Sequence, residues 1–100
     1  MTQPHFSWDD NKAEGNAKKH GVSFEEAATV FRDDEGLRMY DPDHSQKEDR
    51  VLLLGLSSKG RLLVVSHTYR APDEQIRLIS TRKATQATQA ESRQYDRRRS

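Results

Sequence analysis

The first twenty residues are mostly polar, and two aromatic residues, Phe6 and Trp8, precede an acidic start at Asp9 and Asp10. Asp9 is of a type that caps helix N-termini, because its carboxylate accepts hydrogen bonds from the first backbone N–H groups. The cations of residues 18–20 and then Gly21 mark a helix end. Cations complement the helix dipole there, and glycine takes the left-handed conformation without strain. The pattern therefore predicts a helix over residues 10–20.

A second helix is expected directly after Gly21. Ser23 with Glu26 three residues later matches a capping box, in which each side chain bonds to the backbone of the other residue. The next apolar positions follow the spacing i, i+3, i+4, i+7, so they form one stripe on a helix, made of Phe24, Ala27, Ala28 and Phe31. The acidic residues and the glycine of 33–36 then end this helix.

From residue 37 onward the apolar positions follow the pattern of strands. Residues 51–56 and 62–65 are nearly continuous apolar runs joined by a polar turn, which is typical of a hairpin at the centre of a sheet with helices on at least one face. Four strands are predicted, over residues 37–41, 51–56, 62–65 and 75–81, and a last helix over residues 83–97. The expected fold is α+β, with two N-terminal helices, a central antiparallel four-stranded sheet and a C-terminal helix. We expect a single domain over residues 1–100, with residues 98–100 frayed.

The composition indicates a thin core, since 32% of the residues are hydrophobic and 33% are charged. Such a protein is often completed by a partner, while partial disorder is opposed by the periodic segments. There is no cysteine, which excludes disulfides and thiolate sites. No apolar run reaches membrane-spanning length, and the first eight residues lack the apolar segment of a signal peptide. We therefore expect a cytoplasmic protein without a membrane partner.

The net charge of +1 conceals a strong asymmetry between the two halves of the chain. Residues 1–49 have a balance of −6, whereas residues 50–100 have a balance of +7. A basic half that ends in three arginines suggests an anionic partner, with nucleic acid the first candidate. The alternative is that the two halves fold together and neutralise each other.

The residues that could carry chemistry point to phosphate rather than to a metal. The four histidines lie in separate segments without paired spacing, and neither a phosphate-binding glycine loop nor a nucleophilic serine elbow is present. What remains are cations, one acid and a tyrosine, namely Lys19, His20, Glu48, Arg50, His67, Arg70, Arg77, Arg82 and Tyr95. Such a set suits RNA cleavage without a metal or other cofactor. A base activates the 2′-hydroxyl, fixed cations stabilise the phosphorane, and an acid protonates the leaving oxygen.

Each of these residues also has a purely structural explanation. Lys19 and His20 could complement the dipole of the first helix, and arginines beside strands could be solvated edge charges. His67 on a central strand could belong to the core, and Tyr95 could pack the last helix onto the sheet. By strand alternation Arg77 faces opposite to Arg82, so both serve one site only if the chain twists or leaves the strand between them.

Several stretches taken together resemble the BrnT family of toxins from bacterial type II toxin–antitoxin modules. The most specific is KHGVSFEEA, over residues 19–27, which follows an aromatic pair at Phe6 and Trp8. The likeness continues through Glu48-Asp49-Arg50, His67 with Arg70, the run from Arg77 to Ala84, and Glu91 to Tyr95. It extends over nearly the whole chain in the expected order.

The resemblance implies a RelE-like fold and a metal-independent ribonuclease that inhibits translation. It also implies a BrnA-type antitoxin with a ribbon-helix-helix domain, a 2:2 heterotetramer, and operator DNA contacts made only through the antitoxin. By position, the catalytic candidates are Lys19, His20, Arg50, Arg82 and Tyr95. Lys19 and Arg82 would hold the scissile phosphate, Arg50 would stabilise the developing charge, and Tyr95 or His20 would move protons. The RNA-binding candidates are Glu48, His67, Arg70 and Arg77, and no metal ligand or cofactor is implied.

One departure from the family pattern concerns the repeated triplet TQATQA at residues 85–90. Members of the family have about three fewer residues between the positions of Ala84 and Glu91, so one triplet resembles an insertion. Three residues rotate a helix by about 300° and advance it by about 4.5 Å, which would displace Tyr95. The alternative function is therefore a catalytically attenuated BrnT-like module that mainly binds an antitoxin or RNA.

Overall fold

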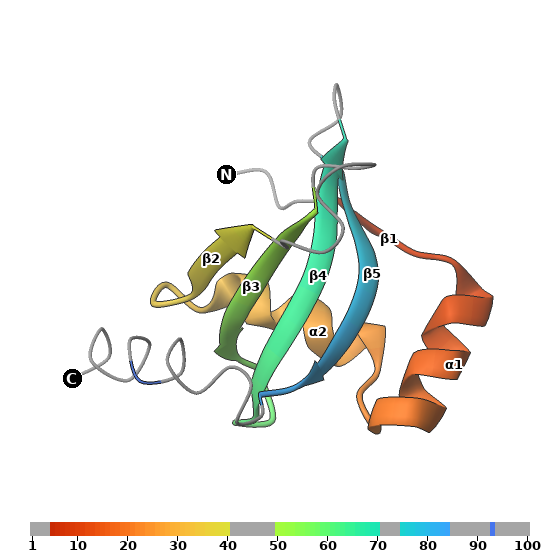
Figure 1. The fold of residues 1–100 in the computed structure, drawn as a ribbon, viewed down its shortest axis with the longest axis horizontal. Helices are drawn as coiled ribbons and strands as arrows, with labels where there is room; N and C mark the ends of the chain where they lie inside the picture. Colours follow the sequence, from red (N-terminus) through yellow and green to blue (C-terminus); the bar gives the residue numbers. More distant parts are fainter. Residues whose placement is uncertain (1–4, 41–49, 71–74, 85–92, 94–100) are drawn as a thin grey trace.

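The computed structural model describes residues 5–40, 50–70, 75–84 and 93. Of the helix predicted over residues 83–97, only Lys83, Ala84 and Arg93 lie in this part of the chain; Arg93 is helical, and the other two are not. The residues expected to be frayed, 98–100, lie outside it. The described elements appear in Figure 1 in this order: β1 (His5–Ser7), α1 (Asp10–His20), α2 (Phe24–Thr29), the 3-10 helix η1 (Val30–Arg32), β2 (Leu37–Tyr40), β3 (Val51–Leu56), β4 (Leu62–Arg70) and β5 (Gln75–Lys83).

The sheet is mixed and has five strands among the described residues, in the order β1-β5-β4-β3-β2. Strands β2 to β5 form an antiparallel meander, and β1 pairs with β5 in parallel. The α+β class is thus confirmed, but the prediction of a wholly antiparallel four-stranded sheet was wrong. The missed strand, β1, has three residues, which is too short for an alternating pattern to be recognised.

The ends of α1 form as the sequence predicts. The Asp9 carboxylate accepts hydrogen bonds from the backbone N–H groups of Asn11 and Lys12, at 2.8 and 3.3 Å. At the other end Gly21 adopts the left-handed conformation with φ of 69°, and its N–H donates to the Ala17 carbonyl. Local chemistry therefore determines where this helix begins and ends.

Only half of the predicted capping box forms at the start of α2. The Ser23 hydroxyl accepts from the Glu26 N–H at 3.1 Å, but the Glu26 side chain turns away to the β3–β4 hairpin. There its carboxylate accepts hydrogen bonds from the Ser57 hydroxyl at 2.6 Å and from the Arg61 guanidinium. The hydrogen bond from Arg61 holds the pKa of Glu26 below its usual value, against the effect of burial. This buried carboxylate fastens α2 to the hairpin.

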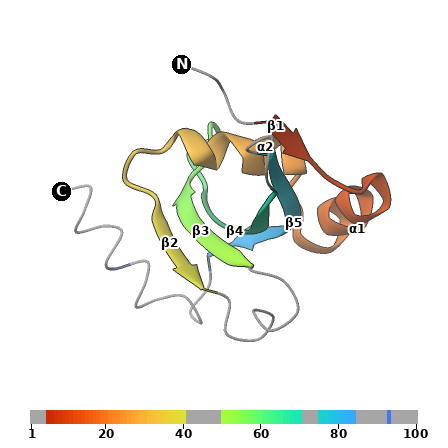
Figure 2. The same ribbon diagram turned by 90° about the horizontal axis from the view of Figure 1, so that it is seen from above.

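The main core lies between the helices and one face of the sheet, which we call the helix face. Figure 2 shows α2 over this face and α1 beyond β5, at the edge of the sheet. The largest side chains with less than 2% exposure in this core include Phe24, Leu63 and Leu78. A smaller cluster around Leu54 and Val64 lies on the opposite face, which we call the second face.

Strands β4 and β5 are both longer than predicted. β4 continues from Val65 to Arg70, and β5 continues to Lys83, which pairs with Leu63. Lys83 was predicted to begin the last helix, but it is the last residue of a strand. Cross-strand pairing extends these strands through polar residues that the apolar pattern did not indicate. Among the described residues no helix combines the length and hydrophobicity needed to span a bilayer.

Candidate active site

A buried asparagine joins the last turn of α1 to the outer edge of β5. The Asn16 side-chain amide donates to the carbonyls of Thr81 and Val22, at 2.9 and 3.0 Å, and accepts from the Thr81 N–H at 3.0 Å. Within the described sheet β1 pairs only with Gln75–Arg77, so Thr81 has no strand on its outer side. The Asn16 amide supplies the donor and the acceptor that a neighbouring strand would supply.

This contact carries Lys19 and His20 toward β5. Residues three and four positions after Asn16 lie on the same side of a helix, so these two side chains share the side of α1 that meets β5. Lys19 is exposed and His20 is partly buried. Arg82, also partly buried, directly follows Thr81. The fold thus gathers three of the predicted catalytic residues along one edge of the sheet.

A β-bulge changes the faces on which the arginines of β5 lie. Ser80 pairs with Ser66 and Leu78 pairs with His67, so Ile79 is an extra residue on β5. Beyond the bulge Arg77 lies opposite Thr68 and Arg82 lies opposite Val64. Thr68 and Val64 are four residues apart on an unbroken strand and share a face, so Arg77 and Arg82 share it too. Simple alternation, which separated these arginines, was wrong at this position.

Two further arginines lie on the same face. Arg70 is opposite Gln75 at the end of β4, two residues beyond Thr68, and its side chain is exposed. Arg50 immediately precedes β3, two residues before Leu52, so by strand alternation it lies on the same face as Leu52. Leu52 pairs with Ser66, which belongs to this face. The second face therefore has four arginines, on β4 and β5 and just before β3. We call this group the arginine face, made of Arg50, Arg70, Arg77 and Arg82. Three polar residues lie on the same face between the arginines, namely Ser66, Thr68 and Ser80.

His67 lies on the helix face and is completely buried, so its predicted role in contacting RNA does not fit its position. Its ring packs edge-to-face against Phe31 and Tyr69, with centroids 4.8 and 5.1 Å apart. Its Nδ1 lies 3.2 Å from the Val65 carbonyl. Burial lowers the pKa of His67 to about 4, so the ring is neutral at pH 7. His67 is part of the core, the structural alternative that the sequence had left open.

Two candidates, Glu48 and Tyr95, lie outside the described residues, as does the TQATQA segment. Within the described ranges no group of three or more His, Asp or Glu side chains is arranged to hold a metal ion. Asn16, by contrast, is a positioning residue whose importance the sequence did not show. The signal that could have found it is an amide in the second half of a polar helix, six residues before the carbonyl of Val22 to which it donates.

The chemistry available to these residues is recognition of phosphate. Guanidinium groups donate paired hydrogen bonds to phosphate oxygens and remain charged at neutral pH. Arg82 belongs to the arginine face and directly follows Thr81, to which Asn16 joins α1, so a phosphodiester bound at this edge could contact cations from two elements. A histidine beside such cations could take or give a proton.

Comparison with known proteins identifies the family. The sequence matches a family model described as the ribonuclease toxin BrnT of type II toxin–antitoxin systems, over residues 8–87. No protein of curated function matches the sequence. The fold is similar to the crystal structure of the Brucella abortus ribonuclease toxin BrnT, with a TM-score of 0.63 and 21% identity, over 84% of this chain and 100% of that one. The family match spans most of the chain, which therefore belongs to the BrnT family of ribonuclease toxins of type II toxin–antitoxin systems.

Proposed function

We propose that this protein is a metal-independent endoribonuclease that cleaves RNA in the cytoplasm and thereby inhibits translation. The observation that carries the proposal is the hydrogen bonding between Asn16 and Thr81, which holds α1 against β5 a few residues before Lys19 and His20 and one residue before Arg82. Membership of a family of ribonuclease toxins supports the same activity. The site is proposed to lie within a single domain formed by residues 1–100.

In the proposed reaction the 2′-hydroxyl of RNA attacks the adjacent phosphate, so the nucleophile belongs to the substrate. Lys19 and Arg82 hold the non-bridging oxygens, and Arg50 stabilises the charge that develops on the phosphorane. His20 or Tyr95 moves the protons. Removing one such donor typically costs about 100- to 1,000-fold in rate.

Neighbouring residues provide matched controls for this assignment. Lys18 precedes Lys19 on α1, is exposed, and pairs with Glu14 at 3.1 Å. Lys83 follows Arg82 on β5 and, by alternation, faces the other way. We expect Lys19→Gln and Arg82→Gln to lower the rate of RNA cleavage at least about 100-fold in the presence of EDTA. Lys18→Gln and Lys83→Gln should change it less than about threefold, because each removes the same kind of charge outside the site.

Expression of the unmodified chain alone should arrest growth of a bacterial host, and the purified protein should cut RNA with EDTA present. Inert behaviour in both assays would refute the proposed activity. Equal losses in the site variants and in their controls would instead refute the assignment of residues.

The membership of a type II toxin family implies an antitoxin partner. We propose that this partner is a BrnA-type ribbon-helix-helix protein, that the complex contains two copies of each chain, and that operator DNA is bound only through the antitoxin. Co-expression should then restore growth, and the mass of the purified complex by light scattering should match the 2:2 assembly. A 1:1 complex would contradict the stoichiometry while leaving the activity intact.

The repeated TQA triplet motivates a second candidate, an attenuated toxin that mainly binds its antitoxin or RNA. Deleting one triplet restores the spacing between Ala84 and Glu91 that is usual in the family. If cleavage is seen only after the deletion, the natural chain is attenuated. Equal cleavage before and after the deletion excludes this alternative.

A further inference from the structure

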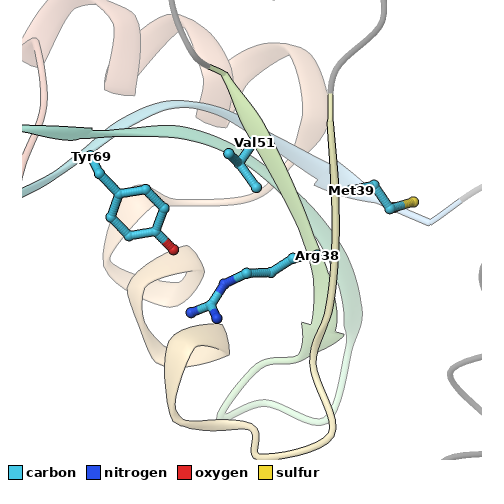
Figure 3. A pocket seen from close by; sticks show the side chains of 4 residues that line it. All are labelled: Arg38, Met39, Val51 and Tyr69. Atoms are coloured by element: carbon cyan, nitrogen blue, oxygen red, sulfur yellow. The ribbon is translucent and has the colours of Figure 1, made fainter.

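A pocket on the helix face, away from the arginine face, is lined by residues to which the proposed cleavage assigns no role. It has a volume of about 230 Å³ and is lined by Arg38, Met39, Val51 and Tyr69. Arg38 pairs with Leu53, and Tyr69 with Ile76, both residues of the main core, which places their side chains on the helix face. In Figure 3 the two side chains point toward each other across the pocket, with Val51 between them. The volume is small for a whole ligand but suits one planar ring system.

The tyrosine in this pocket is held on a rigid support. Tyr69 is 49% exposed and is the one large hydrophobic side chain of that kind among the described residues. Its ring packs edge-to-face on His67, which packs on Phe31, which packs in turn on Phe6. Because His67 is neutral at pH 7, the ring behind Tyr69 is an uncharged aromatic surface. The tyrosine ring is therefore supported by its contact with His67 while about half of its surface remains exposed to a ligand.

The charges around the pocket favour an anionic chain with flat substituents. Arg38 is exposed and forms no ion pair with another described residue. On β4 Arg70 directly follows Tyr69 and projects to the arginine face, where Arg77 lies opposite Thr68. A single RNA strand that passes the end of β4 would thus meet an aromatic ring on one side of the sheet and guanidinium groups on both. Aromatic rings and guanidinium planes are the surfaces on which proteins stack unpaired RNA bases.

We propose that Tyr69 and Arg38 form a subsite for one unpaired base of the RNA substrate, with the base stacked on the tyrosine ring and Arg38 contacting the base or its phosphate. The assignment rests on the proposed ribonuclease function and adds to it a means of positioning single-stranded RNA. It predicts that the protein discriminates against base-paired RNA, whose bases are not available for stacking.

Binding can be separated from cleavage with a labelled six-nucleotide RNA that is 2′-O-methylated throughout, because the blocked hydroxyl cannot attack the phosphate. Fluorescence anisotropy with the full chain gives its Kd. We expect Tyr69→Leu to weaken binding about 10-fold, and Tyr69→Phe and Tyr69→Trp to bind like the unmodified protein. Arg38→Gln should weaken binding several-fold more than Arg32→Gln, which removes an exposed arginine of η1 that does not line the pocket.

An abasic ribose moved through the six positions of the same oligonucleotide tests for stacking directly. At one position the loss of the base should weaken binding to the unmodified protein about 10-fold and should have little further effect on Tyr69→Leu. This coupling between protein and RNA is what a stacked pair produces and what a general loss of charge or of stability does not. Melting temperatures of all variants accompany the binding data. If Tyr69→Leu fails to fold, the abasic scan with Arg38→Gln beside Arg32→Gln tests the subsite instead.

The outcomes separate this subsite from the proposed function on which it rests. If the unmodified protein cuts RNA but Tyr69→Leu and Arg38→Gln bind the oligonucleotide normally, the subsite is refuted and the ribonuclease function stands. If the unmodified protein neither cuts RNA nor binds the oligonucleotide, both are refuted. If the variants weaken only the binding of the antitoxin, the pocket is part of that interface and the subsite is again refuted.

Discussion

Replacing Asn16 by aspartate is expected to loosen α1 from β5 although the side chain keeps its shape. One carboxylate oxygen can still accept the Thr81 N–H, as the amide oxygen does at 3.0 Å. The other oxygen would stand where the amide nitrogen now donates to the carbonyls of Val22 and Thr81, at 3.0 and 2.9 Å. Two buried carbonyl groups would lose their donor and face a negative charge instead.

The size of the effect follows from these two contacts. A buried acceptor left without its donor costs about 1–3 kcal/mol, so the free energy of unfolding should fall by about 2–6 kcal/mol at pH 7. For a chain of this length a loss of 2 kcal/mol lowers the melting temperature by roughly 10 °C. The folded state would also raise the pKa of the new carboxyl above its ordinary value of about 3.9. The folded protein then binds the extra proton more readily, so the deficit should shrink as the pH falls from 7 toward 4.

The measurement is urea unfolding of Asn16→Asp at pH 7 and at pH 4.5, beside Asn11→Asp as a control. Asn11 is exposed in the first turn of the same helix, where a negative charge is favourable. Equal stabilities of the two variants at pH 7 would refute the account of the Asn16 contacts. A destabilised Asn16→Asp that still cleaves RNA normally below its unfolding temperature would refute the role of Asn16 in positioning the site.

Three further predictions concern His67, Gly55 and Glu26. The free energy of unfolding should fall by up to about 3 kcal/mol as the pH drops from 6.5 to about 4, because the unfolded chain binds a proton that buried His67 refuses. His67→Phe should remove this fall in the free energy of unfolding, measured by urea unfolding over the same pH range. An equal fall in the variant and in the unmodified protein would contradict the account. Gly55→Ala should cost about 1–3 kcal/mol, since its new Cβ would lie 2.9 Å from a Val30 methyl carbon, whereas Gly15→Ala, with open space around it, should stabilise α1 by about 1 kcal/mol. Equal melting temperatures of Gly55→Ala and Gly15→Ala would contradict this account of the two glycines. Glu26→Gln should lower stability by about 3 kcal/mol at pH 7, and should abolish the loss that the native carboxylate causes below its ordinary pKa of 4.5. If Glu26→Gln loses as much stability below pH 4.5 as the unmodified protein does, the role assigned to the Glu26 carboxylate is contradicted.

The parts of the fold that the sequence predicts are those decided within a few residues. Asp9, Gly21 and Ser23 act on backbone groups at most four residues away, so their roles at the helix ends are readable from composition and spacing. The β3–β4 hairpin is similar, because two apolar runs joined by a short polar turn leave few other arrangements. Strand β1 was missed because its stabilising partner, Gln75–Arg77, lies about seventy residues away.

The candidate site divides in the same way. The residue types that bind phosphate, and the likeness of KHGVSFEEA to a toxin family, are properties of the chain alone. Their grouping is not, because it depends on a bulge at Ile79 that turns Arg77 and Arg82 to one face. It depends also on a hydrogen-bonded contact between Asn16 and Thr81 across 65 residues of sequence.

By itself, then, the sequence determined the fold class, the family, and the cations from which a ribonuclease site can be made. Only the tertiary structure decided that His67 belongs to the core, that Glu26 fastens α2 to the hairpin, and that the four arginines of the arginine face share one side of the sheet. The physical reason is the range of the interactions involved. Helix caps and apolar periodicity act over one or two turns, whereas burial, strand register and edge hydrogen bonds arise only when distant segments meet.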